Sequence, residues 1–206
     1  MKITRSRYFV PLIVLILGLL IVITSVVSVR NGLNKRNQSV KGATSRYSSA
    51  LSICSKKIQG VWIIADQYMN HESDTFKEYA RIRSDYLAAA KAFEEAKKSG
   101  DMKNLTTSGD QAVKSAMAFR VQVESNPQLK ASETMIENMR NMQEATNEIK
   151  TSLDDWIFAI QDYNTYRGNT LPSIIGRLFP QFPGAVDYFE GEVTSLNIDS
   201  LKPKAK

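Results

Sequence analysis

The residues that could do chemistry are few in this chain of 206 residues, which has one histidine and one cysteine. His71 is followed by Glu72, as in the H-E-x-x-H motif of zinc proteases. The motif needs a second histidine at position 75, where the chain has Thr75. We therefore expect His71, at a predicted helix junction, to have a structural hydrogen-bonding role. A zinc site rich in His or Cys is excluded by these counts, whereas a site made of carboxylates alone is not.

Three other groups of residues have a structural interpretation that we prefer to a catalytic one. Asp154 and Asp155 are adjacent, and neighbouring helical residues point about 100° apart, so they are not a preset acid–base pair. Cys54 falls on an apolar helix stripe and is expected to be a small buried residue. The methionines at 135, 139 and 142 are expected in the core rather than at a soft-metal site.

The sequence contains no Gly-rich phosphate loop, nucleophile elbow or Walker motif. We therefore expect no enzyme activity, no cofactor and no metal. The net charge is +6, and three of the basic residues precede the first apolar segment, which leaves +3 for the rest. A nucleic-acid-binding protein would gather more Lys and Arg on one face, so no nucleic-acid partner is expected.

The elements that would position these residues begin with an apolar segment. Residues 8–29 form 22 consecutive positions without a charge. As a helix they would span about 33 Å, close to the thickness of a bilayer core. Pro11 is expected in the first helical turn, where its missing N–H costs little. The alternative is a cleaved signal peptide, but the run is longer than a usual signal core and no small-residue cleavage site follows.

The basic residues around this segment bear on its orientation. Residues 1–7 form a short basic N-terminus with three basic residues, and five follow the segment within about 20 positions. The positive-inside rule then leans toward a cytoplasmic location for the rest of the chain.

Two long segments carry apolar residues at spacings of three, four or seven, which places them on one stripe of a helix. The first stripe comprises Leu33, Val40, Tyr47, Leu51, Cys54, Ile58, Val61, Ala65 and Tyr68. The last comprises Met135, Met139, Met142, Ile149, Leu153, Trp156, Ile160 and Tyr163, with only Thr146 interrupting it. Such stripes are typical of helices packed lengthwise in a bundle.

Two shorter helices are predicted between these segments. One runs from about 73 to 98, with N-cap chemistry at 73–75 and Gly100 as the C-terminal cap. The next begins at 101–103 and ends at Ser125, because Asn126-Pro127 breaks the helix. The last long helix runs from about 131 to 166. The order long, short, short, long predicts an all-α fold: an N-terminal transmembrane helix followed by an antiparallel four-helix bundle, over residues 30–191, with a polar tail at 192–206.

The segment after the last helix is rich in Pro, Gly and large apolar residues. One interpretation is that it caps one end of the bundle core, and we favour this. The other is that it contacts a membrane or a protein partner. The candidate contact residues are Ile174, Ile175, Leu178, Phe179 and Phe182.

Short motifs occur in a fixed order along the chain. They lie at Asn31, Leu33, Asn37 and Val40, and in the segments 58–60, 68–72, 124–131, 162–165, 172–179 and 188–190. In their order and spacing, these motifs resemble those of the LemA family of small bacterial membrane proteins. Gln59 stands where the family usually has Pro, and residues 156–157 replace an earlier Tyr-Asn. The resemblance implies a four-helix bundle on an N-terminal membrane helix, with no assigned activity and no cofactor. Its recurring polar and aromatic residues form a hypothetical hydrogen-bond cluster at Asn31, His71, Glu72, Tyr163 and Asn164.

We therefore expect a non-catalytic interaction or scaffold protein, anchored by one helix in a cell membrane. Its partners would be the lipid bilayer and an unidentified protein, and a homo-oligomer is left open. The alternative is a ligand-sensing bundle of a membrane receptor. Such receptors usually bracket the bundle between two membrane helices, whereas this chain has one.

Overall fold

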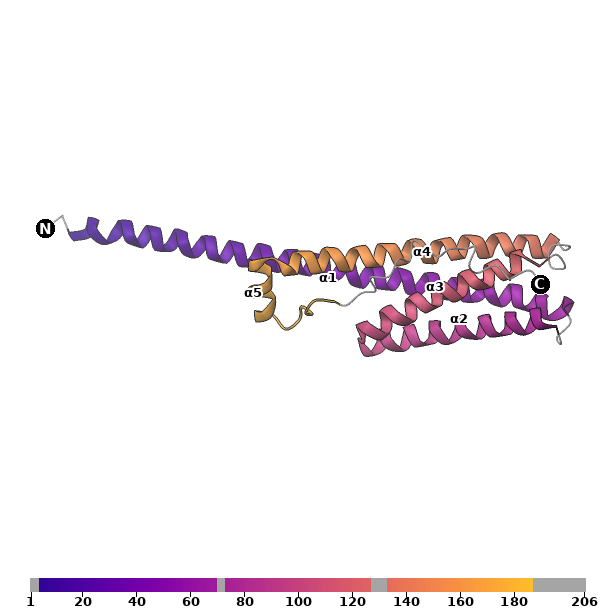
Figure 1. Cartoon of the computed structure of the whole chain (residues 1–206). Coiled ribbons are helices and arrows are strands. Elements are labelled where there is room, and N and C mark those ends of the chain that lie inside the picture. Colours follow the sequence, from indigo (N-terminus) through magenta and orange to yellow (C-terminus); the bar gives the residue numbers. More distant parts are fainter. Residues whose placement is uncertain (1–3, 70–72, 127–132, 187–206) are drawn as a thin grey trace. The chain divides into compact units, whose positions relative to one another are not determined.

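The computed structural model describes residues 4–69, 73–126 and 133–186 of the chain. The regular structure in these ranges is entirely helical (Figure 1). The five helices are α1 (Thr4–Tyr68), α2 (Asp74–Ser99), α3 (Met102–Glu124), α4 (Glu133–Gly168) and α5 (Thr170–Leu178). The predicted all-α fold is confirmed, with a long apolar N-terminal helix followed by a bundle. Residues 4–40 and 161–186 pack as one compact unit, the N-terminal unit, and residues 41–160 pack as a second, the bundle unit.

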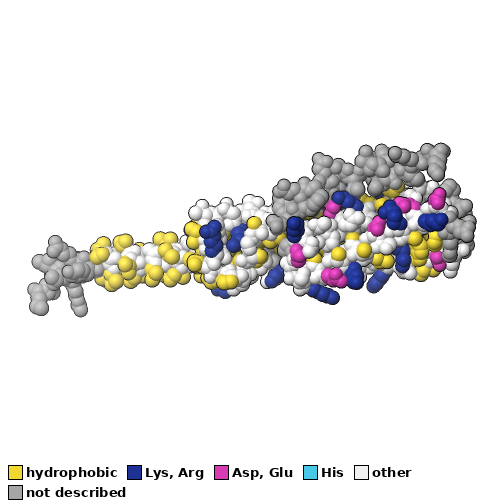
Figure 2. All heavy atoms as spheres, turned by 60° about the horizontal axis from the view of Figure 1, so that its bottom comes forward, with side chains coloured by type: hydrophobic (Ala, Val, Ile, Leu, Met, Phe, Trp, Pro, Cys, Tyr) yellow, Lys and Arg dark blue, Asp and Glu magenta, His cyan; other side chains and the backbone are white. Residues whose placement is uncertain are grey.

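The first part of α1 is apolar on all sides, and none of the other described residues cover it. Every side chain from Phe9 to Thr24 is exposed, and Figure 2 shows this part as hydrophobic surface without charged side chains. Among the described residues, α1 is the one helix long and apolar enough to cross a membrane. Pro11 lies inside α1 and not in its first turn, so that prediction was wrong. The helix begins earlier, at Thr4, because the arginines ahead of Pro11 favour helix.

The helix ends in the bundle unit follow from local capping. The Ser73 Oγ accepts a hydrogen bond from the Phe76 N–H at 3.2 Å, which caps α2. Gly100 ends α2 with a φ of 73°, in the left-handed region that favours glycine. Asp101 then caps α3 by accepting from the Asn104 N–H at 3.1 Å. These caps explain why the predicted bounds of α2 and α3 lie within two residues of the observed ones.

Ring contacts show that neighbouring helices in the bundle unit run antiparallel. Between α1 and α2, Tyr47 contacts Phe93 and Trp62 contacts Phe76, with ring centroids 5.1 and 5.0 Å apart. Residue numbers rise along α1 as they fall along α2. The tight turn at Gly100 makes α2 and α3 antiparallel as well. Between α1 and α4, Tyr47 stacks on Trp156 at 5.7 Å, and further along α1 the Lys57 Nζ donates to the Asn141 side chain at 3.4 Å.

The predicted stripes of the long helices are the observed core. All described side chains of the first stripe are buried, and so are those of the last stripe except Met139, which is half-buried. Thr146, the polar interruption, is also buried and donates to the Gln143 carbonyl of its own helix at 3.0 Å. Helices α2 and α3 add further buried apolar residues to the core, among them Ile82, Leu105, Ala112, Phe119 and Val123.

Candidate functional site

The thiol and the carboxylate pair that the sequence singles out both lie in the bundle unit. Cys54 has no exposed surface, and burial raises the pKa of its thiol to about 12. Asp154 and Asp155 are both exposed on α4. Among the described residues, no three His, Cys, Asp or Glu side chains lie together in a way that would hold a metal ion. The Cys54 thiol is therefore enclosed and protonated at neutral pH.

Three buried tyrosine hydroxyls in the bundle unit donate to backbone carbonyls. Tyr47 donates to Gly109, Tyr79 to Gln122 and Tyr86 to Leu51, each at 2.6 Å. Each bond joins two different helices, so it satisfies a buried hydroxyl and fixes the helices against each other. Burial raises the pKa of all three tyrosines, in the case of Tyr79 to about 12. The hydroxyls therefore stay neutral and serve the packing of the bundle.

In the N-terminal unit, two residues from the hypothetical polar cluster fasten the segment after α5 to α4. The Asn164 Nδ2 donates to the Val186 carbonyl at 2.7 Å, and the Asn164 Oδ1 accepts from the Val186 N–H at 2.8 Å. The Tyr163 hydroxyl donates to the Pro183 carbonyl at 2.7 Å. Burial raises the pKa of Tyr163, while the positive charge of Arg167 acts in the opposite direction. Residues 183–186 are therefore held by three side-chain hydrogen bonds.

One other member of that cluster lies within the described residues. Asn31 is exposed on α1. His71 and Glu72 lie outside the described residues, so the structural role of His71 and the place of this pair in the cluster stay predictions.

Residues that the sequence did not single out form a polar contact between α1 and α4. The Arg36 Nε lies 3.1 Å from the Asp162 carboxylate, and the Arg36 guanidinium lies 4.0 Å from the centroid of the Tyr166 ring. Gly32, one turn before Arg36, makes room for this ring, because a Cβ there would lie 2.3 Å from the Tyr166 hydroxyl oxygen. The sequence offers only a weak indication of this contact, namely that Arg36 follows Leu33 by three residues and so lies beside the apolar stripe.

Helix α5 divides the candidate contact residues into two sets. Ile175 and Phe182 are buried, at 5% and 4% exposure, so they belong to the protein's own interior. Ile174 and Leu178 are exposed, at 54% and 71%, and Phe179 is half-buried. The Phe179 ring contacts Phe182, with centroids 6.4 Å apart, and the Arg30 guanidinium lies 5.4 Å from the Phe179 ring centroid. The segment thus packs on the N-terminal unit while part of its apolar surface stays open.

Arg167 links the end of α4 to α5. A Cβ on Gly176 would lie 1.8 Å from the Arg167 Nη1, so the guanidinium packs directly on the backbone of α5. This Nη1 is buried and makes no hydrogen bond within the described residues. Glycine at 176 leaves the space that the end of the Arg167 side chain occupies.

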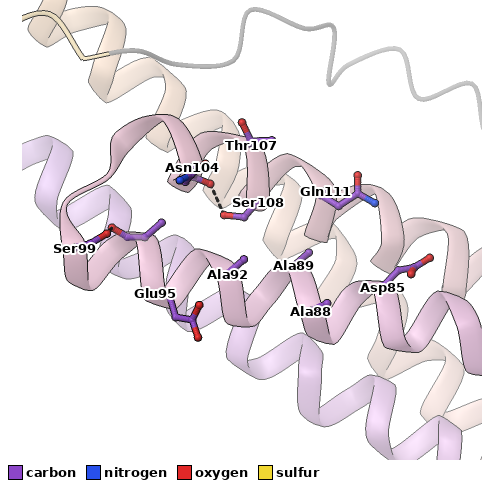
Figure 3. Close-up of a pocket in the computed structure, with 11 residues that line it drawn as sticks. Asp85, Ala88, Ala89, Ala92, Glu95, Ser99, Asn104, Thr107, Ser108 and Gln111 are labelled. Carbon is purple, nitrogen blue, oxygen red and sulfur yellow. Dashed lines mark hydrogen bonds between the residues drawn. The ribbon is translucent and has the colours of Figure 1, made fainter.

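A shallow groove runs between α2 and α3 in the bundle unit (Figure 3). Its volume is about 770 Å³, and alanines of α2, among them Ala88 and Ala92, form one wall. The other wall carries short polar side chains of α3. One of them, Ser108, donates to the Asn104 carbonyl of its own helix at 2.6 Å. Asn104 in turn donates to the Asp101 carboxylate at 2.6 Å. The groove is therefore open and lightly polar, with several of its polar groups already bonded locally.

Together, these features define a class: a helical-bundle protein whose first helix extends as a bare apolar segment. The family model described as LemA family matches residues 55–195. The chain belongs to the LemA family, as its motifs predicted. Comparison with curated proteins and with solved structures gave no match.

Proposed function

We propose that this chain is a single-pass membrane protein that holds a non-catalytic helical bundle at the bacterial cell membrane, where it acts as an interaction or scaffold protein. The observation that carries the proposal is the bare first part of α1, exposed on every side from Phe9 to Thr24. An apolar helix of this length is stable when lipid surrounds it. Lipid would shield these apolar side chains from water without any further protein.

The interior of the bundle unit supports a non-catalytic role. Its buried hydroxyls donate to backbone carbonyls across helices, and its thiol is buried and neutral. Catalytic groups need access to a substrate and a pKa near the working pH. The work of such a bundle would then lie on its outer surface.

The most exposed large hydrophobic side chain among the described residues of the bundle unit marks where to look for a protein partner. Phe158 on α4 is 72% exposed, and aromatic residues are enriched in protein interfaces. We expect a photo-crosslinking residue at Phe158, in the full chain in intact cells, to form a discrete protein adduct. The same residue at Lys91, an exposed position on α2, is the matched control and should give none. Absence of a protein adduct at both positions would contradict the role in partner binding at this face.

The groove between α2 and α3 favours a second candidate function, the binding of a small ligand by the bundle. Its volume of about 770 Å³ is sufficient for a small molecule. The test is the melting temperature of the full chain with a panel of small polar metabolites, compared with an Ala92→Phe variant that fills the groove. Ligand sensing predicts an upward shift that the variant loses, and no shift for any metabolite in the panel would argue against it.

A further inference from the structure

We propose that α5 is a second membrane contact, in which its exposed apolar side chains enter the surface of the bilayer that α1 crosses and the surrounding arginines bind anionic lipid headgroups. This inference rests on the proposed membrane insertion of α1 and names lipid as the partner of the C-terminal segment.

The first observation is that α5 is apolar on two faces. Leu171, Ile174 and Leu178 follow one another at spacings of three and four, so they share one side of the helix. We call them the outer stripe, and they are 56%, 54% and 71% exposed. The buried residues of α5 are Pro172, Ile175 and Gly176. A helix at an aqueous surface normally has a polar outer face, so the outer stripe lacks a covering partner within the N-terminal unit.

The second observation places this stripe at the end of the apolar run. Arg30 is the first charged residue after that run, so it marks where α1 leaves the hydrocarbon. Its guanidinium contacts the ring of Phe179, the residue that follows α5. On α1 itself, Ser25 and Val26 are half-buried and Val29 is 9% exposed, so protein packing begins within the last turns of the apolar run. The packed part of the N-terminal unit therefore reaches the level of the bilayer surface.

The third observation is the charge around the outer stripe. After the apolar run, the described part of the N-terminal unit has one acidic side chain, Asp162, and this pairs with Arg36 at 3.1 Å. The basic residues there are Arg30, Lys35, Arg36, Arg167 and Arg177. Such a surplus attracts anionic headgroups, and an apolar stripe flanked by arginines is typical of helices that lie in the membrane surface. A second copy of this chain would instead bring one basic surface against another, which is unfavourable.

The experiment uses the full chain in vesicles of phosphatidylcholine, with and without phosphatidylglycerol. A fluorescent NBD group is attached to a cysteine introduced by Leu178→Cys. Leu178 is 71% exposed, so the change leaves the core intact, and Ile174→Cys repeats the measurement. Cys54 is buried and gives no competing label. Quenching by spin-labelled lipids reports contact with the bilayer, and reduction by dithionite reports contact with water.

Two control positions calibrate the signal. Leu15→Cys lies within the apolar run, and Lys91→Cys lies on the exposed face of α2. We expect the label at 178 to be quenched by lipid nearly as strongly as at 15, and to resist dithionite, unlike the label at 91. Quenching at 178 should be stronger with phosphatidylglycerol, and Arg177→Gln should reduce that difference.

The outcomes separate this inference from the proposed function. If the label at 15 is quenched and the label at 178 behaves like that at 91, α5 does not contact the membrane. The proposed insertion of α1 in the bilayer is then still supported. If neither 15 nor 178 is quenched, the anchor itself fails. Protection from dithionite at 178 without lipid quenching would mean that another copy of the protein covers the stripe, which overturns the inference. Equal quenching with and without phosphatidylglycerol would overturn the role of the arginines.

Discussion

The hydroxyl of Tyr79 shows how single residues hold the bundle unit together. It donates to the Gln122 carbonyl near the end of α3, at 2.6 Å. Burial raises the pKa of Tyr79 from 10.0 to about 12. The fold therefore favours the neutral phenol, whose contribution to stability is complete below pH 10 and is lost as the pH rises toward 12.

We predict that the free energy of unfolding of the detergent-solubilised full chain falls as the pH rises from 10 to 12. Tyr79→Phe removes the interhelical hydrogen bond, so it should lower this free energy by about 1 kcal/mol at pH 8 and make its fall with pH less steep. Urea unfolding at a series of pH values measures both. The control is Val123→Ala on α3, which removes buried methyl groups and should leave the slope unchanged. The same slope in Tyr79→Phe and the wild-type chain would contradict the prediction.

At the scale of elements, the attachment of residues 183–186 to α4 depends on the side chain of Asn164. Its side chain both donates to and accepts from Val186, at 2.7 and 2.8 Å. Asn164→Ala removes both bonds, so we predict a loss of about 1–3 kcal/mol and faster hydrogen exchange at the Val186 amide. Hydrogen exchange and thermal unfolding of the full chain measure these changes. Thr165→Ala, at an exposed neighbouring position, is the control and should change neither. Unchanged exchange at Val186 in Asn164→Ala would refute this fastening role.

The elements differ in how far the sequence predicts them. The stripes of α1 and α4 were predictable because helical periodicity repeats over many turns, and the ends of α2 because Ser73 and Gly100 have specific capping roles. The pairing of Arg36 with Asp162 was not predictable, since the two residues are 126 positions apart and a single ion pair leaves no period. The two-sided character of α5 was missed for a related reason. In nine residues with apolar side chains on both faces, periodicity cannot tell which side packs inward.

At the scale of the whole molecule, the basic residues around the apolar run bear on the orientation of the chain in the membrane. Counted along the sequence, three basic residues precede the apolar run and five follow it closely. The structure brings two further arginines, Arg167 and Arg177, into the compact unit that contains the run. Basic residues next to a membrane helix favour the cytoplasmic side. Within this unit, five basic residues and one acidic residue, Asp162, follow the apolar run, against three basic residues before it. The charge difference across the run therefore has the same direction in the folded unit as in the linear count.

We predict from this difference that the bundle unit is cytoplasmic. Lys98→Cys places a thiol at an exposed position near the end of α2, and Cys54 is buried and should stay unlabelled. A membrane-impermeant maleimide should label position 98 only after the cells are lysed. The matched control is Ser6→Cys, on the other side of the apolar run, which should be labelled in cells whose outer envelope is permeabilised but whose inner membrane is intact. Labelling of position 98 under that condition, with protection of position 6, would reverse the orientation. The crosslinked partner at Phe158 would then have to be an envelope protein.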